Sequence, residues 1–188
     1  MCMEQLLLAD SPPHLRLTVS RAASAPGVAL LQHTIYGTYG PQYSHTGQAE
    51  KVGQITDPYF FDLWVGTELA GTYCLSERLV HTPAGPVPGY YGRYLAVAAT
   101  HRGHGYGHRL KQEAVRYIER TRPAPQVFYS CIESANARSL RISAQAGFRP
   151  LAQLEALVFG RLYPRADARF GQLAAEEMPA LRARLAAA

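Results

Sequence analysis

Hydrophobic and polar positions divide the first third of the chain into a strand, a helix and a weakly patterned segment. Residues 15–19 (LRLTV) alternate apolar and polar side chains, which predicts a half-buried strand. Ser24-Ala25-Pro26 places a capping side chain before a proline and predicts the start of a helix. Its apolar positions are Val28, Leu30, Leu31 and Ile35. Residues 36–58 are rich in Gly, Tyr and Gln, and we expect a loop there with room for a short helix.

The middle of the chain predicts a β-hairpin followed by a proline-containing loop. Two β-prone runs, residues 60–65 and 69–75, flank the turn pair Gly66-Thr67. Residues 81–89 contain three prolines. Proline has no amide hydrogen for a strand ladder, so we expect a loop over this range.

The most strongly patterned stretch runs from residue 90 to residue 118. YYGRYLAVA at 90–98 is aromatic and β-branched, which predicts a strand. It leads into the glycine-rich sequence RGHGYG at 102–107. Helical spacing follows at once and predicts a helix that ends before Pro123. The apolar positions of this helix are Leu110, Ala114, Val115 and Ile118.

Shorter elements follow toward the C-terminus. VFYSCI at 127–132 predicts a buried strand, and Asn136 is a suitable N-cap for a helix over 137–146 that Gly147 closes. We expect two further strands, at 148–154 and 155–162.

The Ala-rich, charged segment from residue 165 onward predicts helix interrupted at Pro179. The chain has no internal repeat and no linker long enough to separate two domains. We therefore expect one α/β domain over residues 1–164, with a helical appendage at 165–188.

The composition fits a cytoplasmic protein with a hydrophobic core. The chain has 188 residues, of which 47% are hydrophobic and 18% charged. No apolar run approaches the roughly 20 residues that span a bilayer, and the LLLAD stretch is too short and lacks the basic lead-in of a signal peptide. The three cysteines form no CxxC pair, which argues for a reduced protein. Membrane proteins, disulfide scaffolds and structural zinc modules are therefore not expected.

The chain is basic, and arginine provides nearly all of the positive charge. The formal net charge is +5, and Lys51 and Lys111 are the only lysines. Arginine binds phosphate and carboxylate with a fixed fork of donors. The charge therefore suits a nucleic acid, an anionic cofactor or solubility alone, and genomic base composition is a sufficient explanation of the arginine bias.

The predicted strand, glycine-rich loop and helix form an arrangement that binds phosphate, because the helix N-terminus carries about half a positive charge. The loop is not a Walker motif, since neither Lys nor Ser/Thr follows its glycines. It also departs from the dinucleotide fingerprint, because His108 stands where a final small residue is required. Considered alone, the glycine triplet suits a tight turn equally well.

The complete string from Val97 to Leu110 resembles the acetyl-CoA signature of the GCN5-related N-acetyltransferases. Arg102, Gly105 and Gly107 occupy the positions of their Arg/Gln-x-x-Gly-x-Gly/Ala motif. The strand, Asn136, helix and Gly147-Phe148 that follow are also similar to the family. The resemblance covers roughly residues 15–162 and implies an α/β fold. Its mixed, mostly antiparallel central sheet would be splayed between strands 4 and 5 and flanked by helices.

The resemblance implies that acetyl-CoA is the acyl donor and that no metal is needed. By analogy, the backbone of Leu95, Val97 and Ala99 would bond the pantetheine arm within the splay, and Asn136 would bond it from the other side. Asn136 also suits an ordinary helix N-cap, and it can fill both roles. The pyrophosphate would be bound by the loop residues Arg102, Gly103, His104, Gly105, Tyr106, Gly107 and His108.

The reaction implied is direct transfer of an acetyl group to a primary amine, which must be neutral to attack. The usual acid of the family is a tyrosine seven positions after the asparagine, and here that position holds Ser143. The pKa of serine is too high for an efficient acid, so Ser143 would hydrogen-bond the sulfur or position a water. A thiol pKa of about 8.5 also allows a solvated thiolate to leave without an acid.

The base that receives the amine proton has several candidates. Some family members carry a glutamate early on the fourth strand, where this chain offers Tyr91 and Tyr94. Cys131 is better explained as a buried strand cysteine than as a nucleophile. The nearest other titratable groups are Glu77, His81 and Glu133, each of which also suits a surface position.

We expect a small-molecule or peptide amine as acceptor, and neither nucleic acid nor membrane as partner. In the family, the acceptor pocket is built from the first helices and the loop after the third strand. Aromatic rings there would suit an apolar or aromatic amine or a cation, although they suit the core as well. The rings are Tyr36, Tyr39, Tyr43, Tyr59, Phe60 and Phe61.

Two alternatives to an acetyltransferase remain open on the sequence. The first is a non-catalytic acyl-CoA sensor of the same fold, which would explain the missing acid and base. The second is a basic nucleic-acid-binding module, which would explain the charge and the tyrosines but not the glycine loop. The sequence does not indicate an oligomeric state.

Overall fold

The computed structural model describes residues 3–6, 14–35, 42–44, 46–122, 125–154, 175–180 and 183. The chain divides into two compact units, the first made of residues 1–80 and 86–149 and the second of residues 81–85 and 150–188. The first unit contains most of the sheet and helices α1–α4. In the second unit, a short 3-10 helix, η2, spans Ala175–Glu177.

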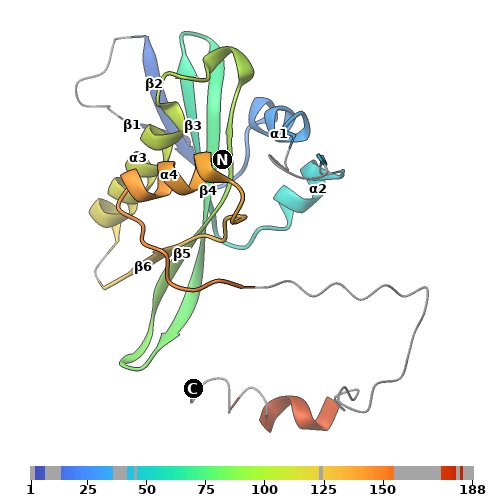
Figure 1. Cartoon of the computed structure of the whole chain (residues 1–188), viewed down its shortest axis with the longest axis vertical. Coiled ribbons are helices and arrows are strands. Elements are labelled where there is room, and N and C mark those ends of the chain that lie inside the picture. Colours follow the sequence, from blue (N-terminus) through green and yellow to red (C-terminus); the bar gives the residue numbers. More distant parts are fainter. Residues whose placement is uncertain are drawn as a thin grey trace. The chain divides into compact units, whose positions relative to one another are not determined.

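A six-stranded sheet with the order β1-β2-β3-β4-β5-β6 forms the centre of the first unit (Figure 1). The pairs β1–β2, β2–β3 and β3–β4 are antiparallel, whereas β5 and β6 are parallel. The mixed, mostly antiparallel sheet predicted from the sequence is therefore confirmed. The strands are β1 (Met3–Leu6), β2 (Leu15–Ser20), β3 (Pro58–Val65), β4 (Glu68–Thr82), β5 (Gly85–Val97) and β6 (Val127–Tyr129).

Strands β5 and β6 pair over only three residues and then diverge. Gly89–Tyr91 pairs with Val127–Tyr129, after which β5 continues to Val97 while β6 ends. We call the diverging segments, Gly92–Val97 of β5 and residues 130–133, the fork. Its closed end is the last pair, Tyr91 with Tyr129. β5 and β6 correspond to the fourth and fifth predicted strands, because β1 precedes the first strand predicted from the sequence. This divergence is therefore the splay that the resemblance implied.

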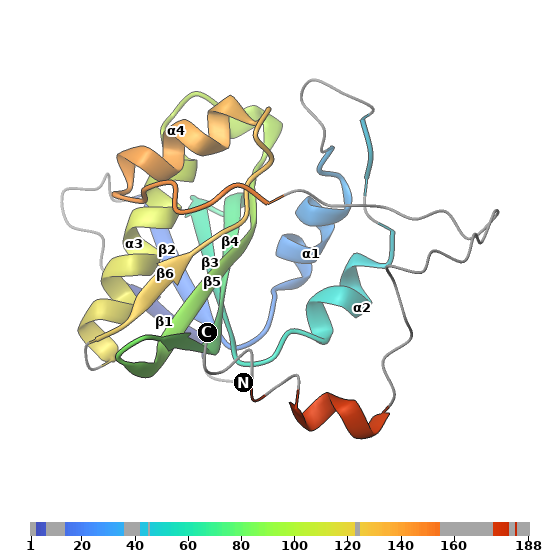
Figure 2. The ribbon, with the colours of Figure 1, turned by 60° about the horizontal axis from the view of Figure 1, so that its bottom comes forward.

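Helices cover both faces of the sheet. Figure 2 shows α3 and α4 over one face and α1 and α2 over the other. The predicted helix starts are confirmed: Ser24 Oγ accepts the Gly27 amide at 3.0 Å, and Asn136 Oδ1 accepts the Ser139 amide at 3.0 Å. The helices are α1 (Ala25–Gln32), α2 (Gln48–Gly53), α3 (Tyr106–Thr121) and α4 (Ala137–Gln145), with a 3-10 turn, η1, at Ala99–His101.

Two hydrophobic clusters lie on opposite faces of the sheet, because successive strand residues point to opposite sides. Phe61 and Tyr73 belong to the cluster under α3, and their chain neighbours Phe60 and Cys74 belong to the cluster with Leu31 of α1. The central strands β3 and β4 are therefore apolar on both faces. The predicted apolar face of α3 is confirmed at Leu110, Ala114 and Ile118, which are 0% exposed.

The loop predicted at residues 81–89 is wrong, because β4 extends to Thr82 and β5 begins at Gly85. Strand β6 pairs with β5 only from Gly89 onward, so β5 has no partner strand on that edge before Gly89 among the described pairings. Prolines at the alternate positions 86 and 88 can turn their nitrogens toward this edge without breaking a ladder hydrogen bond. The hairpin is therefore longer than the proline count indicated.

The strand predicted at 127–132 ends at Tyr129, and the strand predicted at 148–154 is absent from the described residues. Beyond Tyr129 the chain leaves β5, so Cys131 is exposed rather than a buried strand cysteine. Residues 148–154 pair with no strand among the described residues, and Leu151 is 98% exposed. β-propensity alone does not make a strand. The strand predicted at 155–162 lies outside the described residues.

Candidate functional site

The glycine-rich loop between β5 and α3 requires glycine for its backbone conformation. Gly103 and Gly105 have φ of +88° and +74°, and a Cβ atom at either position would meet no atom of the described residues within 4 Å. These positions are therefore glycine because L side chains rarely adopt such φ values, not because space is short. Gly105 is also the N-cap of α3, and no side chain caps the helix there. The first amides of the helix therefore donate no hydrogen bond to a side chain of the N-cap residue.

Gly107, in contrast, is glycine because the space around it is short. It is buried in the first turn of α3, and a Cβ atom would lie 3.3 Å from Ile142 Cδ1 and 3.6 Å from Val97 Cγ2. The start of α3 is thus packed closely against α4 and the end of β5. This packing holds the helix N-terminus at the open end of the fork.

Cationic and aromatic side chains surround this loop. Arg102 Nε lies 3.5 Å from the carbonyl oxygen of Val97, and the ring of His104 stacks on Tyr106 at 5.5 Å between centroids. His108 Nε2 is buried and has no hydrogen-bond partner within the described part of the chain. A helix N-terminus, left-handed glycines and the guanidinium of Arg102 together fit a bound pyrophosphate or a similar anion.

The three backbone positions expected to bond a pantetheine arm do not share one element. Leu95 and Val97 lie on β5 within the fork, where the strand edge has no β6 partner. Ala99 lies beyond the strand in η1, and its carbonyl oxygen accepts the Arg102 amide at 3.4 Å. Two of the three positions thus offer strand geometry to a ligand, and the third belongs to the turn that leads into the loop.

The regular alternation of β5 is interrupted at Tyr94. Its φ of +56° is uncommon for a non-glycine residue and is found in bulges and strained functional segments. The guanidinium of Arg93 donates to the Tyr94 hydroxyl at 3.0 Å. The strand therefore changes the direction of its peptide groups inside the fork, next to its closed end.

The most unusual polar contact in the described interior joins α3 to α4. Lys111 of α3 is only 3% exposed, and its Nζ donates to Ser143 Oγ at 2.5 Å and to Ser130 Oγ at 3.4 Å. Its Nζ also lies 4.4 Å from the ring centroid of Phe148. Burial lowers the pKa of Lys111 to about 8. Ser143, one of the predicted site residues, is thus held by a buried cation.

Sequence reasoning missed Lys111, although a signal was present. Position 111 precedes Ala114, Val115 and Ile118 by three, four and seven residues, which places it on the apolar face of the helix. A lysine on such a face, in a chain with two lysines, marks a buried charge that needs an explanation.

The carboxylate candidates have partners on different sides of the sheet. Glu133 follows β6, is exposed, and accepts from the Tyr43 hydroxyl at 2.6 Å, a hydrogen bond that raises the pKa of Tyr43. Glu77 lies on β4 and pairs with Arg122 at 3.3 Å. Glu77 is four residues from Tyr73 in the same strand, a separation of about 13 Å along β4.

Two other candidates lie elsewhere. His81 belongs to the second unit, and Asn136 is the N-cap of α4.

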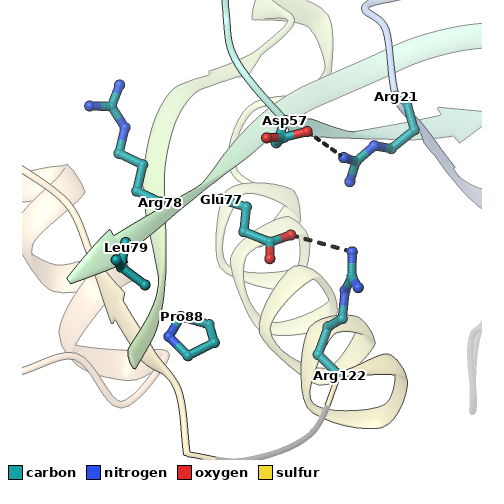
Figure 3. A pocket seen from close by; sticks show the side chains of 7 residues that line it. All are labelled: Arg21, Asp57, Glu77, Arg78, Leu79, Pro88 and Arg122. Carbon is teal, nitrogen blue, oxygen red and sulfur yellow. Dashed lines mark hydrogen bonds and ion pairs between the residues drawn. The ribbon is translucent and has the colours of Figure 1, made fainter. Parts of the chain in front are cut away.

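Glu77 borders a hollow of about 420 Å³ in which opposite charges pair. Figure 3 shows the ion pairs Arg21–Asp57 and Arg122–Glu77, with Arg78 pointing away from both. The guanidinium of Arg122 also donates to the Tyr59 hydroxyl. These pairs neutralise most of the charge, so this hollow offers little to a charged ligand.

A second hollow, of about 280 Å³, is cationic. Its lining contains Arg93 and Tyr94 of the fork and, among the described residues, no carboxylate. The ring of Tyr91 lies 5.7 Å from the guanidinium carbon of Arg78 and 5.7 Å from that of Arg93. We call this second hollow the cationic pocket. Its lining residues are Lys51, Gln54, Ile55, Thr56, Arg78, Arg93 and Tyr94.

The cationic pocket and Lys111 lie on opposite faces of the sheet. Tyr94 packs against the cluster of α1 and α2, while Lys111 lies between α3 and α4. The fork can thus be approached from both faces. Within the described residues, no group of His, Cys, Asp and Glu could hold a metal ion, and no helix is long and apolar enough to cross a membrane.

Comparison with known families gives a match over most of this architecture. The model of the acetyltransferase (GNAT) family matches residues 29–148, a range that includes the fork, the glycine loop and α4. No curated protein sequence matches the chain.

Solved structures share the fold at low sequence identity. A transcriptional regulator from Bacillus halodurans has a TM-score of 0.59 at 16% identity, covering 76% of this chain and 99% of that chain. An acetyltransferase from Trypanosoma brucei has a TM-score of 0.56 at 19% identity, covering 77% and 99%. An aminoglycoside acetyltransferase from an uncultured soil metagenomic sample, in complex with sisomicin, has a TM-score of 0.53 at 13% identity, covering 80% and 97%.

Proposed function

Since the chain belongs to the acetyltransferase (GNAT) family, we propose that it transfers an acetyl group from acetyl-CoA to a primary amine. The observation that carries this proposal is the glycine loop at the open end of the fork, with left-handed Gly103 and Gly105 before an uncapped helix N-terminus. Bound acetyl-CoA would supply the acetyl group as an activated thioester.

The loop from Arg102 to His108 would hold the pyrophosphate through backbone amides and cationic side chains. The free edge of β5 at Leu95 and Val97 would bond the pantetheine arm as an added strand, since its ladder has no β6 partner there. Near the closed end, the irregular backbone at Tyr94 would direct an amide toward the reacting carbonyl and stabilise charge that develops on it.

The cationic pocket is our candidate for the acceptor site, because Arg93 and Tyr94 belong both to its lining and to the fork. Three cations without a carboxylate favour an acceptor that carries a carboxylate or a phosphate beside its amine. An aromatic lining, which the sequence left open beside a core role for the same rings, receives less support. Tyr59, Phe60 and Phe61 are at most 5% exposed and form core, whereas Tyr36 and Tyr39 lie outside the described residues.

Calorimetric titration with CoA and acetyl-CoA tests the donor site. We expect micromolar binding by the wild type and its loss in Gly105→Glu, which places a side chain and a negative charge in the loop. Gly66→Glu is the matched control, because Gly66 also has a positive φ of +59° and open space around its Cβ position, but lies in the β3–β4 turn. Absence of wild-type binding, or equal loss in both variants, would refute the proposed donor site.

Thiol release from acetyl-CoA tests turnover and the class of acceptor. Pairs of amines that differ only by an anionic group, such as an amino acid and its amide, isolate the contribution of that group. We expect the anionic member of each pair to be the better substrate, with a preference that weakens as salt is added. Binding without turnover of any amine would favour the acyl-CoA sensor instead.

A further inference from the structure

Lys111 is a buried charge to which the proposed function gives no role. We propose that Lys111, acting through Ser143, supplies the proton that the leaving sulfur takes up when the acetyl group is transferred. This inference rests on the proposed function, because it assigns the acid of that same reaction. Ser143 would be the group that contacts the sulfur, and Lys111 would be its proton-supplying partner.

The hydrogen bond between the two side chains fixes the direction of the Ser143 hydroxyl. A lysine ammonium has three donors and no acceptor, so Ser143 Oγ must accept from Lys111 Nζ. The hydroxyl proton of Ser143 is then available to another acceptor, and no hydrogen bond from it is seen among the described residues. Two of the three ammonium donors are engaged, by Ser143 and by Ser130.

The pair lies at the closed end of the fork. Ser130 is the first residue after β6, and Gly92 is the first residue of β5 beyond the shared pairing. The Lys111 ammonium lies 6.0 Å from the ring centroid of Tyr73, and the hydroxyl of that same tyrosine abuts Gly92. The glycine loop lies at the other end, past Val97. An arm anchored in the loop and running back along β5 would therefore end beside Ser143.

The surroundings of Lys111 favour release of its proton. Burial lowers its pKa to about 8, so the group is mainly protonated at neutral pH but is a much stronger acid than an exposed lysine. The elements packed around it present the phenol of Tyr73 from β4, Ser143 from α4, and Ser130 followed by the exposed Cys131 after β6. None of these groups is a carboxylate that would hold the ammonium in its charged form.

The transfer then balances in atoms and charge. A C–N bond to the acceptor forms, the thioester C–S bond breaks, and its electron pair stays on sulfur. Ser143 gives its hydroxyl proton to the sulfur while Lys111 gives a proton to Ser143, which leaves Lys111 neutral. The proton lost by the acceptor amine passes to a base and from there to solvent, and Lys111 is reprotonated from solvent afterwards. Ser143 thus needs no unusual acidity, because its own proton is replaced as it leaves.

The arrangement also explains the departure at position 143. The tyrosine that the family usually carries there is an acid by itself, and a serine is not. A serine joined to a buried ammonium restores both the proton and the positive charge with two side chains. The sulfur would be reached from the α3–α4 face, while the cationic pocket lies on the face of α2. Acid and acceptor would therefore not compete for space.

The thiol pKa of bound CoA tests this proposal without any acceptor. The ultraviolet absorbance of the thiolate is followed against pH for the CoA complex, and the same titration with desulfo-CoA is subtracted to remove protein tyrosines and cysteines. The proteins compared are the wild type, Lys111→Met and Ser143→Ala. Arg120→Met is the matched control, since it removes an exposed cation from the same helix. Calorimetry on each protein measures CoA binding separately.

We expect the thiol pKa of CoA bound to the wild type to lie about one unit or more below that of free CoA, as a nearby ammonium favours the thiolate. Lys111→Met should return it to the free value, Ser143→Ala should return it part of the way, and Arg120→Met should leave it lowered. A wild-type value equal to that of free CoA, or a lowered value that persists in Lys111→Met, would overturn the inference while the donor site stands.

If the wild type does not bind CoA, both the proposed function and this inference are refuted, and calorimetry detects that case directly. Lys111→Met keeps the length of the side chain and replaces a buried charge with an apolar group, so it should fold. If it does not, Ser143→Ala decides alone, because a lowered thiol pKa that is unchanged in this variant is incompatible with a path through Ser143.

Discussion

The hydroxyl oxygen of Tyr73 in β4 occupies the space that a Cβ atom would take at Gly92 in β5. Tyr73 is 1% exposed and Gly92 is buried, so the ring has no free space into which to turn. Since Gly92 is the first residue of β5 beyond the pairing with β6, this contact fixes the closed end of the fork. The buried ring also contributes to the apolar surroundings that lower the pKa of Lys111.

Gly92→Ala should therefore destabilise the protein by about 1–3 kcal/mol, the usual cost of overpacking a rigid core. Gly53→Ala in α2 is the matched control, since a Cβ atom there meets nothing within 4 Å. Urea unfolding of both variants measures the difference. An equal effect of the two substitutions would show that Tyr73 can move aside.

The lowered pKa of Lys111 should make stability depend on pH in a defined window. Between about 8, its value in the folded protein, and 10.5, its ordinary value, the unfolded chain binds more protons than the folded one. The free energy of unfolding therefore rises with pH across this window, and the contribution is absent in Lys111→Met. Below pH 8, Lys111→Met should be more stable than the wild type by on the order of 1–3 kcal/mol.

The measurement is the difference in urea unfolding free energy between wild type and Lys111→Met at several pH values from 7 to about 10.5. Taking the difference removes the ionisation of tyrosines, which is common to both proteins. A difference that does not change with pH would mean that Lys111 has an ordinary pKa in the folded state.

Arg93 should affect binding of the acceptor rather than the chemical step. Its guanidinium lies 4.5 Å from the Tyr94 ring centroid and hydrogen-bonds the Tyr94 hydroxyl, so it is held in place at the cationic pocket. We expect Arg93→Met to raise KM for an anionic amine by about tenfold or more, as loss of a charge-assisted hydrogen bond does, with little change in kcat. The KM for the matched uncharged amine should be unaffected, and an equal rise for both amines would contradict an anion-binding role.

Mutation should show which of the two glutamate candidates is the base. Glu133 follows β6 on one arm of the fork and bonds Tyr43, which precedes α2, whereas Glu77 is held by Arg122 on the α3 face. We expect Glu133→Gln to lower kcat/KM by about 100-fold, the lower end for a general base. Glu77→Gln should change it little and cost at most about 1 kcal/mol of stability. A steady-state assay at neutral pH decides between them, and the reverse order of effects would make Glu77 the base.

The sequence determined those parts of this protein that depend on local chemistry. Ser24 and Asn136 predict helix starts because the side-chain oxygen of each accepts the backbone amide of the residue three positions later. Gly103 and Gly105 indicate a loop with positive φ angles because residues other than glycine rarely adopt that backbone conformation. The same local signals carried the resemblance to the acetyltransferases, which the family match over residues 29–148 confirms.

Features that depend on a distant partner could not be found in this way. Residues 148–154 have the propensity of a strand but pair with none of the described strands. The prolines at 86 and 88 are tolerated because β6 pairs with β5 only from Gly89 onward. The sequence also left Phe60 and Phe61 open between an acceptor pocket and the core, and the structure buries their rings on opposite faces of β3.

The catalytic arrangement proposed here depends on the tertiary structure most of all. Lys111 and Ser143 are 32 residues apart, and nothing local relates them. Helices α3 and α4 pack on the same face of the sheet and bring the ammonium to the hydroxyl. A pKa set by burial exists only once that packing has removed water. The sequence alone determined that a left-handed, glycine-rich loop leads into a helix, and the folded interior decided which side chains meet at the other end of the fork.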